Sequence, residues 1–153
     1  MHALELKVPP PVVALILALA MWAVSRFTFT FEVDVALRAV LALTIALVGG
    51  AFSAAGITAF RRAKTTVNPM KPDTATALVT GGIYRVTRNP MYVGLLLVLV
   101  GWTAFLCAPW ALVGPVIFVT YMNRFQIAPE ERALLSVFGD AYTRYQAGVR
   151  PWL

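Results

Sequence analysis

The stretch from Thr76 to Gly94 combines turn, helix-start and ligand-binding residue types in a short space. Gly81-Gly82 permits a sharp turn with a positive φ. Asn89 followed by Pro90 is typical of a helix start, with asparagine at the cap and proline in the first turn. A helix that begins there presents free N–H groups and its positive dipole end, which together attract a carboxylate or phosphate. The same residues also fit a capped membrane helix with interfacial tyrosines, so the pattern alone leaves both interpretations open.

A second group of polar residues runs from Arg124 to Glu131. Glu130 and Glu131 are adjacent carboxylates, and such a pair can bind an ammonium group or ribose hydroxyls. Alternatively, each stabilises the start of a helix that Pro129 opens, which contributes about 0.3–1 kcal/mol. Taken by itself, this segment favours the electrostatic role at a helix start.

The scaffold that must position these segments is strongly apolar. Of the 153 residues, 59% are hydrophobic and 13% are charged, and a soluble domain carries about twice that charged fraction. Folding in water would expose more apolar surface than so short a chain can bury, so the composition predicts an integral membrane protein. The length predicts a single domain over residues 1–153. The first apolar stretch runs into Arg26 without a small-residue cleavage site, which favours a retained helix over a signal peptide.

Four apolar runs predict four transmembrane helices, over residues 9–29, 35–60, 91–108 and 109–125. Each except the last approaches the ~20 residues that cross the hydrocarbon core of a bilayer. We expect a tight turn from Cys107 to Trp110 between the last two, and a loop over residues 61–90.

The tail differs from the apolar runs because its large side chains recur at helical spacing between polar residues. Leu134, Phe138, Tyr142 and Tyr145 form this pattern. It predicts one amphipathic helix over residues 129–147 at the membrane interface. The predicted fold class is therefore all-α integral membrane, with four transmembrane helices and a C-terminal amphipathic cytoplasmic helix.

The basic residues are distributed asymmetrically about the predicted spans. Eleven of the 13 lysines and arginines lie on the side of the two termini and the loop 61–90, and only Arg26 and Arg38 lie on the other. By the positive-inside rule, both termini and this loop are cytoplasmic. Because the basic residues cluster between apolar runs, the net charge of +6 reflects topology, and we expect no nucleic-acid partner.

The content of cysteine and histidine argues against metal and disulfide chemistry. Cys107 is the single cysteine, so an intramolecular disulfide and a thiolate cluster are excluded. It lies in an apolar run, where a free cysteine usually serves as a small packing residue. The single histidine, His2, lies at the terminus, and we predict no metal site.

Small residues are concentrated in the second apolar run and recur in the third. They permit close helix packing in a membrane or leave space for a ligand, and we favour packing because such runs are common in membrane helices. The residues concerned are Gly49, Gly50, Ser53, Ala54, Ala55 and Gly56, together with Gly94 and Gly101.

Considered together, the two polar segments resemble the isoprenylcysteine carboxyl methyltransferase superfamily, to which phospholipid N-methyltransferases also belong. The resemblance covers about residues 61–153. It is carried by Gly82-Ile83-Tyr84 through Arg88-Asn89-Pro90-Met91-Tyr92, then by Glu130-Glu131, and then by Phe138-Gly139-Asp140-Ala141-Tyr142-Thr143-Arg144-Tyr145. The resemblance implies methyl transfer from S-adenosylmethionine to a lipophilic or lipid-amine acceptor that enters from the membrane. It implies cytoplasmic chemistry, membrane lipids as partners and, from similarity to small bacterial members, a bacterial inner membrane.

The resemblance also implies which residues form the site. Glu130 holds the polar end of the cofactor, Glu131 supports it, and Arg88 orients or pairs with a carboxylate. Gln126 and Arg124 complete the candidate catalytic set with Arg88 and Glu130. The residues implied to contact the cofactor are Thr76, Ala77, Leu78, Val79, Gly82, Tyr84, Asn89, Pro90, Met91, Tyr92, Glu130 and Glu131.

Two positions depart from the prenylcysteine enzymes. Asn89 stands where the eukaryotic members have histidine, as it does in many bacterial relatives. Gln126 stands where an arginine of those enzymes pairs with the substrate carboxylate. Glutamine cannot form a charge-assisted bidentate pair, so a prenylcysteine substrate is disfavoured, although Arg124 lies nearby.

Two other classes of function compete with this interpretation. A small multidrug-type transporter needs an acidic residue inside a span, and none of the four apolar runs contains one. The second class is a non-catalytic scaffold or sensor that retains the methyltransferase fold. The intact set of motif residues argues against this alternative. The acceptor, the oligomeric state and the group that deprotonates an amine or thiol acceptor (Glu130, Glu131, Tyr84 or water) stay open.

Overall fold

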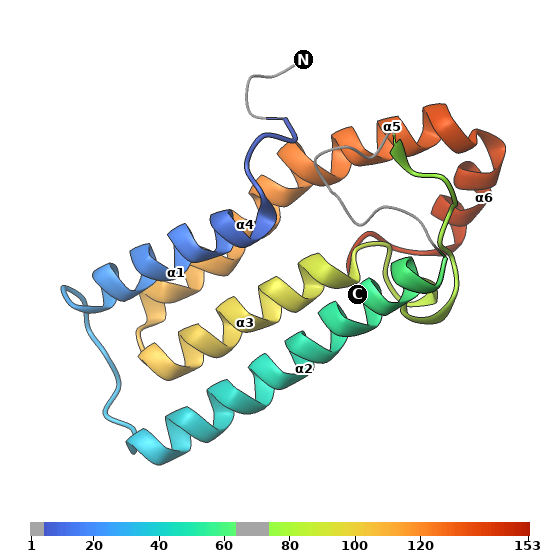
Figure 1. The fold of residues 1–153 in the computed structure, drawn as a ribbon. Helices are drawn as coiled ribbons and strands as arrows, with labels where there is room; N and C mark the ends of the chain where they lie inside the picture. The colour runs from blue at the N-terminus through green and yellow to red at the C-terminus, as the bar shows by residue number, and fades with distance from the viewer. Residues whose placement is uncertain (1–4, 64–73) are drawn as a thin grey trace.

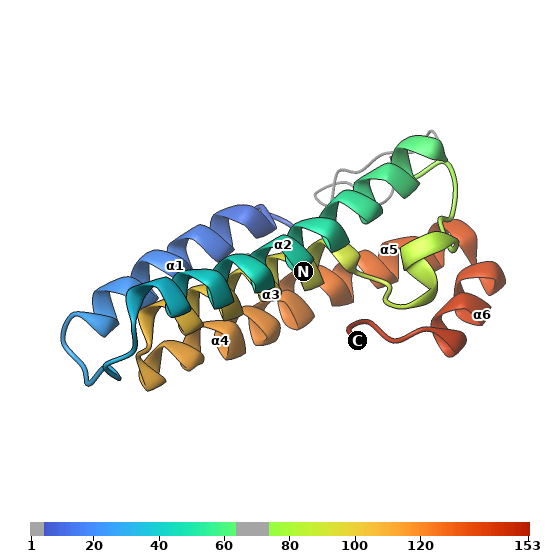
Figure 2. The ribbon, with the colours of Figure 1, turned by 90° about the horizontal axis from the view of Figure 1, so that it is seen from below.

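The computed structural model describes residues 5–63 and 74–153, and within them every regular element is a helix. Three long apolar helices come first, as Figures 1 and 2 show. They are α1 (Pro10–Ser25), α2 (Val35–Arg62) and α3 (Pro90–Leu106). α4 (Val113–Met122) follows a 3₁₀ turn at Pro109–Leu112, and α5 (Ala128–Phe138) and α6 (Asp140–Gly148) form the polar end. His2, Lys64, Lys71 and the middle of the predicted loop 61–90 lie outside the described residues.

α3 lies at the centre of the bundle and packs against α1, α2 and α4. Its contact with α2 is the most extensive, because glycines let the two backbones approach. A Cβ atom on Gly49 would lie 2.6 Å from the Gly94 carbonyl oxygen, and one on Gly101 would lie 2.8 Å from that of Ala42. The packing role predicted for the small residues is thus confirmed at these positions, whereas Gly50 faces open space.

Local sequence explains where these helices begin and end. The Asp34 carboxylate accepts hydrogen bonds from the backbone N–H groups of Ala36 and Leu37, at 3.0 and 3.1 Å, and so caps α2. α3 ends at Cys107, which adopts a left-handed conformation with φ +49°. The predicted turn between the third and fourth apolar runs is confirmed there, while α1 ends at Ser25, earlier than residue 29.

The helix formed by the fourth apolar run does not end at residue 125 as predicted, but continues beyond it. A π-helical turn, Asn123–Ile127, joins α4 to α5 without a break, and its flanking residues keep right-handed helical dihedrals. The predicted single tail helix over 129–147 is wrong, because Gly139 separates α5 from α6. Its φ of +51° is a conformation that glycine adopts readily and that reverses the chain direction. α6 therefore turns back toward the start of α3 (Figure 1).

Among the described helices, α2 alone is long and apolar enough to cross a membrane by length and composition. α1 and α3 are apolar but shorter, with 16 and 17 residues. Large apolar side chains on α1 and α2 are exposed; Leu15, Leu19, Leu43 and Leu47 are examples. An apolar exterior of this kind is what lipid contact requires.

Candidate functional site

The centre of the candidate site is a partly buried carboxylate where the start of α3 meets the start of α5. One oxygen of Glu130, Oε1, accepts a hydrogen bond from the Tyr92 hydroxyl. Gln126 Nε2 donates to the same oxygen at 3.4 Å. Tyr92 and Gln126 are only 5% and 1% exposed, so both partners of this carboxylate are fixed by packing.

The helical turn that carries these residues explains why they converge. Gln126 and Glu130 are four residues apart, so their side chains lie on one face of the continuous helix. The single π-helical turn inserts one extra residue into the helix. The insertion rotates the face that carries Gln126 and Glu130 relative to α4. Turns of this kind recur at functional sites in other proteins.

The environment of Glu130 changes its acidity. The pKa of its carboxyl is raised to about 8, mainly by burial and to a smaller extent by the Glu131 carboxylate, while the Tyr92 hydrogen bond acts in the opposite direction. Burial also raises the pKa of Tyr84 well above its ordinary value, with smaller contributions from Tyr145 and Glu130. At neutral pH the site therefore holds neutral phenols and a carboxyl that a nearby cation can ionise.

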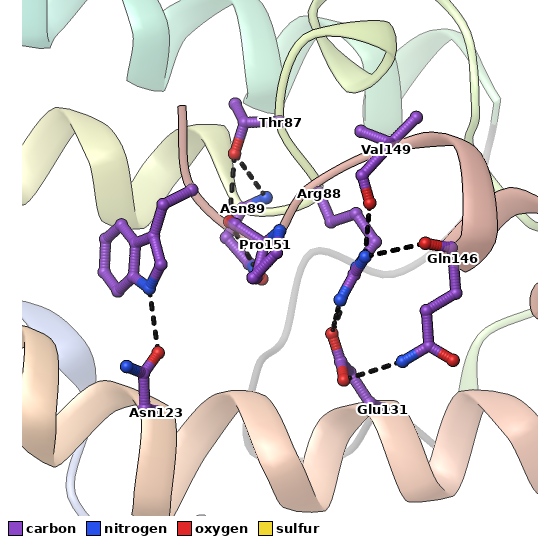
Figure 3. A network of polar contacts seen from close by, with 9 residues as sticks. Thr87, Arg88, Asn89, Asn123, Glu131, Gln146, Val149 and Pro151 are labelled. Atoms are coloured by element: carbon purple, nitrogen blue, oxygen red, sulfur yellow. Dashed lines mark hydrogen bonds and ion pairs between the residues drawn. The ribbon is translucent and has the colours of Figure 1, made fainter.

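Glu131 belongs to a separate network, shown in Figure 3. Arg88 Nε and Nη2 both donate to Glu131 Oε1, at 3.0 and 2.5 Å. Gln146 Nε2 donates to Glu131 Oε2 at 2.9 Å, and Arg88 Nη1 donates to the carbonyls of Gln146, at 3.1 Å, and of Val149. The two adjacent carboxylates thus serve different partners, and Arg88 links the loop before α3 to α5 and α6.

The predicted side-chain cap at Asn89 is wrong. Asn89 occupies the cap position of α3, but its side chain makes no capping hydrogen bond. Its Nδ2 instead donates to the carbonyl oxygen of Pro151 at 3.0 Å. The first turn of α3 therefore has no side-chain acceptor of its own at its positive end.

Tyr84 lies on a 3₁₀ turn, Gly82–Arg85, that precedes α3. Gly82 has a φ of +62°, so the positive φ predicted for the glycine pair is confirmed at its second residue. Tyr84 is 4% exposed and packs edge-to-face on Phe60 with ring centroids 5.3 Å apart. Its carbonyl accepts a hydrogen bond of 2.7 Å from the Tyr145 hydroxyl, which ties this turn to α6.

The remaining predicted residues occupy varied positions. Pro90 is buried, Met91 is half-buried against Gly56, and Arg124 is exposed on the π-helical turn. Thr76 is exposed, whereas Ala77, Leu78 and Val79 are half-buried in the segment before the 3₁₀ turn. The structure therefore brings Tyr92, Gln126 and Glu130 together, with Arg88 and Glu131 beside them.

Sequence reasoning missed several residues that build this end of the molecule. Thr87 is fully buried and joins Pro151 to the backbone of Asn89. Gln146 and Trp152 donate to partners on α5 and on the π-helical turn. The indole of Trp152 was the one available signal, because an aromatic donor next to a proline in a polar tail usually has a partner.

Comparison with known proteins now bears on this geometry. Residues 37–141 match the family model for phospholipid methyltransferases. The chain belongs to this family. The match includes α3, the π-helical turn and all of α5, so the convergence of Tyr92, Gln126 and Glu130 lies inside the family region.

Two relatives are similar to parts of this chain. An uncharacterized protein of Haemophilus influenzae is 51% identical over 63 residues, which are 41% of this chain and the whole of that protein. Protein-S-isoprenylcysteine O-methyltransferase of Xenopus laevis is 36% identical over 72 residues, which are 47% of this chain. Only 25% of the Xenopus enzyme is matched. No solved structure matches the chain. The resemblance drawn from the sequence is confirmed at the level of the superfamily.

Proposed function

We propose that this family member is an integral membrane enzyme that transfers the methyl group of S-adenosylmethionine to a lipophilic or lipid-amine acceptor. The observation that carries the proposal is the carboxyl of Glu130, held by Tyr92 and Gln126 at the start of α3. Methyltransferases named in the comparisons support the reaction class.

The residues present fit S-adenosylmethionine by charge and polarity. The cofactor carries an ammonium group, from which the Glu130 carboxylate can accept a hydrogen bond, and a sulfonium, which the same carboxylate attracts electrostatically. It also carries a carboxylate, which suits the positive end of α3. This helix end has no side-chain cap, because the Asn89 side chain bonds the Pro151 carbonyl instead. The buried ring of Tyr84 and the half-buried segment 77–79 supply apolar surface in the part of the chain that precedes α3.

The chemistry asks little of side chains beyond position and exclusion of water. The cofactor supplies a methyl group that its sulfonium already activates. Tyr92 and Gln126 fix the Glu130 carboxylate, while Arg88 and Glu131 hold the loop before α3 against α5. An amine or thiol acceptor must lose a proton, which Glu130 can accept only in its ionised form. Without a bound cation this carboxyl is mainly protonated at neutral pH, because its pKa is about 8, so a bound cation is needed to ionise it.

A groove on the apolar part of the molecule supports a lipophilic acceptor. It lies between α1, α2 and α3, has a volume of about 740 Å³ and is lined almost wholly by apolar side chains. Leu95, Leu99 and Trp102 line it from α3. These residues continue, at helical spacing, the face that begins with Tyr92. An alkyl chain in this groove would direct its polar end toward the candidate site.

The Gln126 side chain distinguishes between classes of acceptor. It is buried and donates to Glu130, so it offers no cation to a substrate carboxylate. Loss of a charged partner for a buried carboxylate costs several kcal/mol, or about 10²-fold or more in rate. We therefore expect turnover with lipid amines or small lipophilic nucleophiles and little with farnesylcysteine analogues. Robust turnover of the farnesylcysteine analogue, with no gain from Gln126→Arg, would assign the carboxylate contact to Arg124.

The proposed topology has four spans, α1 to α4, with both termini and the candidate site in the cytoplasm. It rests on the asymmetry of the basic residues and on the apolar exterior of α1 and α2. Cysteines introduced near Phe29 and after Leu153 in a Cys107→Ala background should be labelled from opposite sides of the membrane. Labelling of the C-terminus from outside would overturn the orientation.

The direct test is calorimetry of the purified protein with S-adenosylmethionine and its demethylated product, followed by a methyl-transfer assay with a membrane-lipid extract. Tyr92→Phe removes only the hydroxyl that donates to Glu130 and should weaken cofactor binding about tenfold, as expected for a charge-assisted hydrogen bond. Tyr121→Phe, a half-buried tyrosine on α4 in contact with Phe125, is the matched control. Failure of the unmodified protein to bind either compound would falsify the proposal.

A further inference from the structure

The two halves of the candidate site belong to segments that are distant in sequence. Tyr92 lies on the first turn of α3, whereas Gln126 and Glu130 lie on the π-helical turn and on α5. The separation of the two halves decides whether Tyr92 reaches Glu130. Residues 149–152, here termed the strap, contact both halves, as Figure 3 shows.

The contacts of the strap with the first half are directional and numerous. The backbone N–H of Arg88 donates to the Arg150 carbonyl at 2.9 Å. The Pro151 carbonyl accepts two hydrogen bonds, from Thr87 Oγ1 and from Asn89 Nδ2, each of 3.0 Å. Thr87 is fully buried and also accepts from the Asn89 backbone N–H at 3.1 Å. The residues immediately before α3 are thus held by the strap through both backbone and side chains.

The contacts of the strap with the second half centre on Trp152. Its indole Nε1 donates to Asn123 Oδ1, on the π-helical turn, at 2.8 Å. Its ring packs against the buried cluster that includes Tyr92, Met122 and Ile127. At the other end of the strap, the Val149 carbonyl accepts from Arg88, which is bound to Glu131 on α5.

We infer that the strap positions the site: Thr87 and Trp152 set the separation between Tyr92 and Glu130. The catalytic consequence rests on the proposed function, but the positional claim stands on these contacts alone. A reacting geometry tolerates displacements of only about 0.5 Å, and a misplacement of about 1 Å can cost 10²-fold in rate. Loss of a strap contact should therefore impair the site more than it impairs folding.

The first measurement needs no ligand. Spin labels at Val86→Cys and Leu135→Cys, both exposed positions, report the distance between the loop before α3 and α5 in a Cys107→Ala background. We expect a narrow distance distribution for the otherwise unmodified protein and one at least about twofold broader in Trp152→Ala and Thr87→Val. Thr87→Ser keeps the hydroxyl and should restore the narrow distribution. Trp110→Phe, at an exposed tryptophan on the far turn, is the matched control.

The second measurement is the affinity of the same proteins, without labels, for the demethylated cofactor, together with KM and kcat. We expect about tenfold weaker binding in Trp152→Ala and Thr87→Val, a smaller change in Trp152→Phe, and thermal unfolding that shifts by only a few degrees.

The two measurements separate the possible failures. An unchanged distance distribution in both variants overturns the inference, whatever the binding data. A broader distribution with unchanged affinity also overturns it, because the strap would then not position the site. A broader distribution in a protein that binds no cofactor even when unmodified supports the strap and rejects the proposed function.

Discussion

The apolar bundle of α1 to α4 is held together by different interactions from those of the polar junction, which comprises the loop before α3, the π-helical turn, α5, α6 and the strap. In the bundle, α1 to α4, the threonines bond carbonyls of their own helices, as Thr44 does to Val40 and Thr103 to Leu99. Contact between these helices depends mainly on apolar side chains and on glycines, with one hydrogen bond of 3.0 Å from Trp102 Nε1 on α3 to the Ala18 carbonyl on α1. In the junction, hydrogen bonds such as Arg88–Glu131 and Asn89–Pro151 join residues 43 and 62 positions apart. Apolar packing is non-directional, whereas these hydrogen bonds require particular donors and acceptors in one geometry.

The difference assigns distinct roles to the two regions. The bundle supplies most of the close packing of apolar side chains, which stabilises contacts between helices in a membrane. The junction supplies a carboxylate, a helix start and a network that fixes them. Substitutions in the bundle should therefore alter the free energy of unfolding with little effect on cofactor affinity. Substitutions of Glu130 should lower cofactor affinity with little effect on the free energy of unfolding.

Glu130→Ala should produce the largest effect on function. It removes the acceptor for the cationic part of the cofactor, and loss of one preorganised electrostatic group commonly lowers the rate by about 10²–10³-fold. Thermal unfolding should change little, because the variant also removes a carboxyl with a raised pKa. Leu135→Ala, at an exposed position on α5, is the control and should keep full activity.

The counterpart in the bundle is Leu99→Ala. Leu99 is 1% exposed on α3, and truncation there should cost about 2–5 kcal/mol of stability through lost burial and a residual cavity. Cofactor affinity below the unfolding temperature should stay within about twofold. A loss of affinity as large as that of Glu130→Ala would remove the distinction between the two regions.

Arg88→Ala should affect both stability and function, because this arginine connects the halves of the junction. The side chains of Arg88 and Glu131 are 9% and 22% exposed, so the variant leaves a largely buried carboxylate without its cation. We expect a loss of about 2–4 kcal/mol in the free energy of unfolding, measured by denaturant titration.

Two further variants show whether this loss depends on position. Arg85→Ala removes the same charge from an exposed position nearby and should change stability by no more than about 0.5 kcal/mol. Arg88→Lys keeps the charge but cannot bond Glu131 and two carbonyls in the same fork, and should recover only part of the stability. Equal stability of Arg85→Ala and Arg88→Ala would show that the network contributes nothing.

The sequence predicted the bundle better than the junction, for a physical reason. The starts of α2 and α3, the turn at Cys107 and the packing of Gly49 and Gly94 follow from apolar runs, proline and small residues, which act locally or without direction. The continuous helix through the π-helical turn was missed, because the apolar run ends before this turn while the helix continues through it.

In the junction, the resemblance supplied the residues but not their partners. It named Asn89, Glu130 and Glu131, yet a hydrogen-bond partner depends on which distant segment arrives alongside. Asn89 therefore bonds Pro151, where local rules predicted a helix cap. The break at Gly139 had a local signal, a glycine within an amphipathic pattern, and it escaped notice because the large side chains kept helical spacing across it.

Two neighbouring glycines on α2, Gly49 and Gly50, test whether the bundle can accommodate one added Cβ atom. Gly49→Ala should cost about 1–3 kcal/mol, because the new Cβ would lie 2.6 Å from the Gly94 carbonyl oxygen and the helices would have to separate. Gly50→Ala meets nothing within 4 Å and should be neutral or stabilising by up to about 1 kcal/mol, since alanine favours the helix. Thermal unfolding in a fixed detergent or lipid measures both. Equal effects at the two positions would exclude the close approach of α2 and α3.

The smallest expected effect is the release of the Glu130 proton when the cofactor binds. Burial raises the pKa of Glu130 to about 8 in the protein without cofactor, so at pH 7 the carboxyl is mainly protonated. A bound cation favours the carboxylate and lowers this pKa, so cofactor binding should release up to one proton. Because the bound state holds fewer protons, the affinity should rise with pH, by at most about tenfold per unit below pH 8, and level off above it.

Calorimetry at pH 7 in two buffers of different ionisation enthalpy measures that proton directly. Glu130→Gln keeps the size and polarity of the side chain but cannot titrate, so its weaker binding should show no proton release and no pH dependence over this range.

The same group predicts the opposite trend, a decrease in stability with rising pH, for the protein without cofactor. Its folded-state pKa lies above the unfolded value of 4.5, so the unfolded state holds fewer protons between pH 4.5 and 8. The contribution of Glu130 to stability is therefore complete below pH 4.5 and declines as the pH rises to 8, while cofactor affinity increases. Affinity and stability that changed in the same direction with pH would exclude Glu130 as the group that couples them.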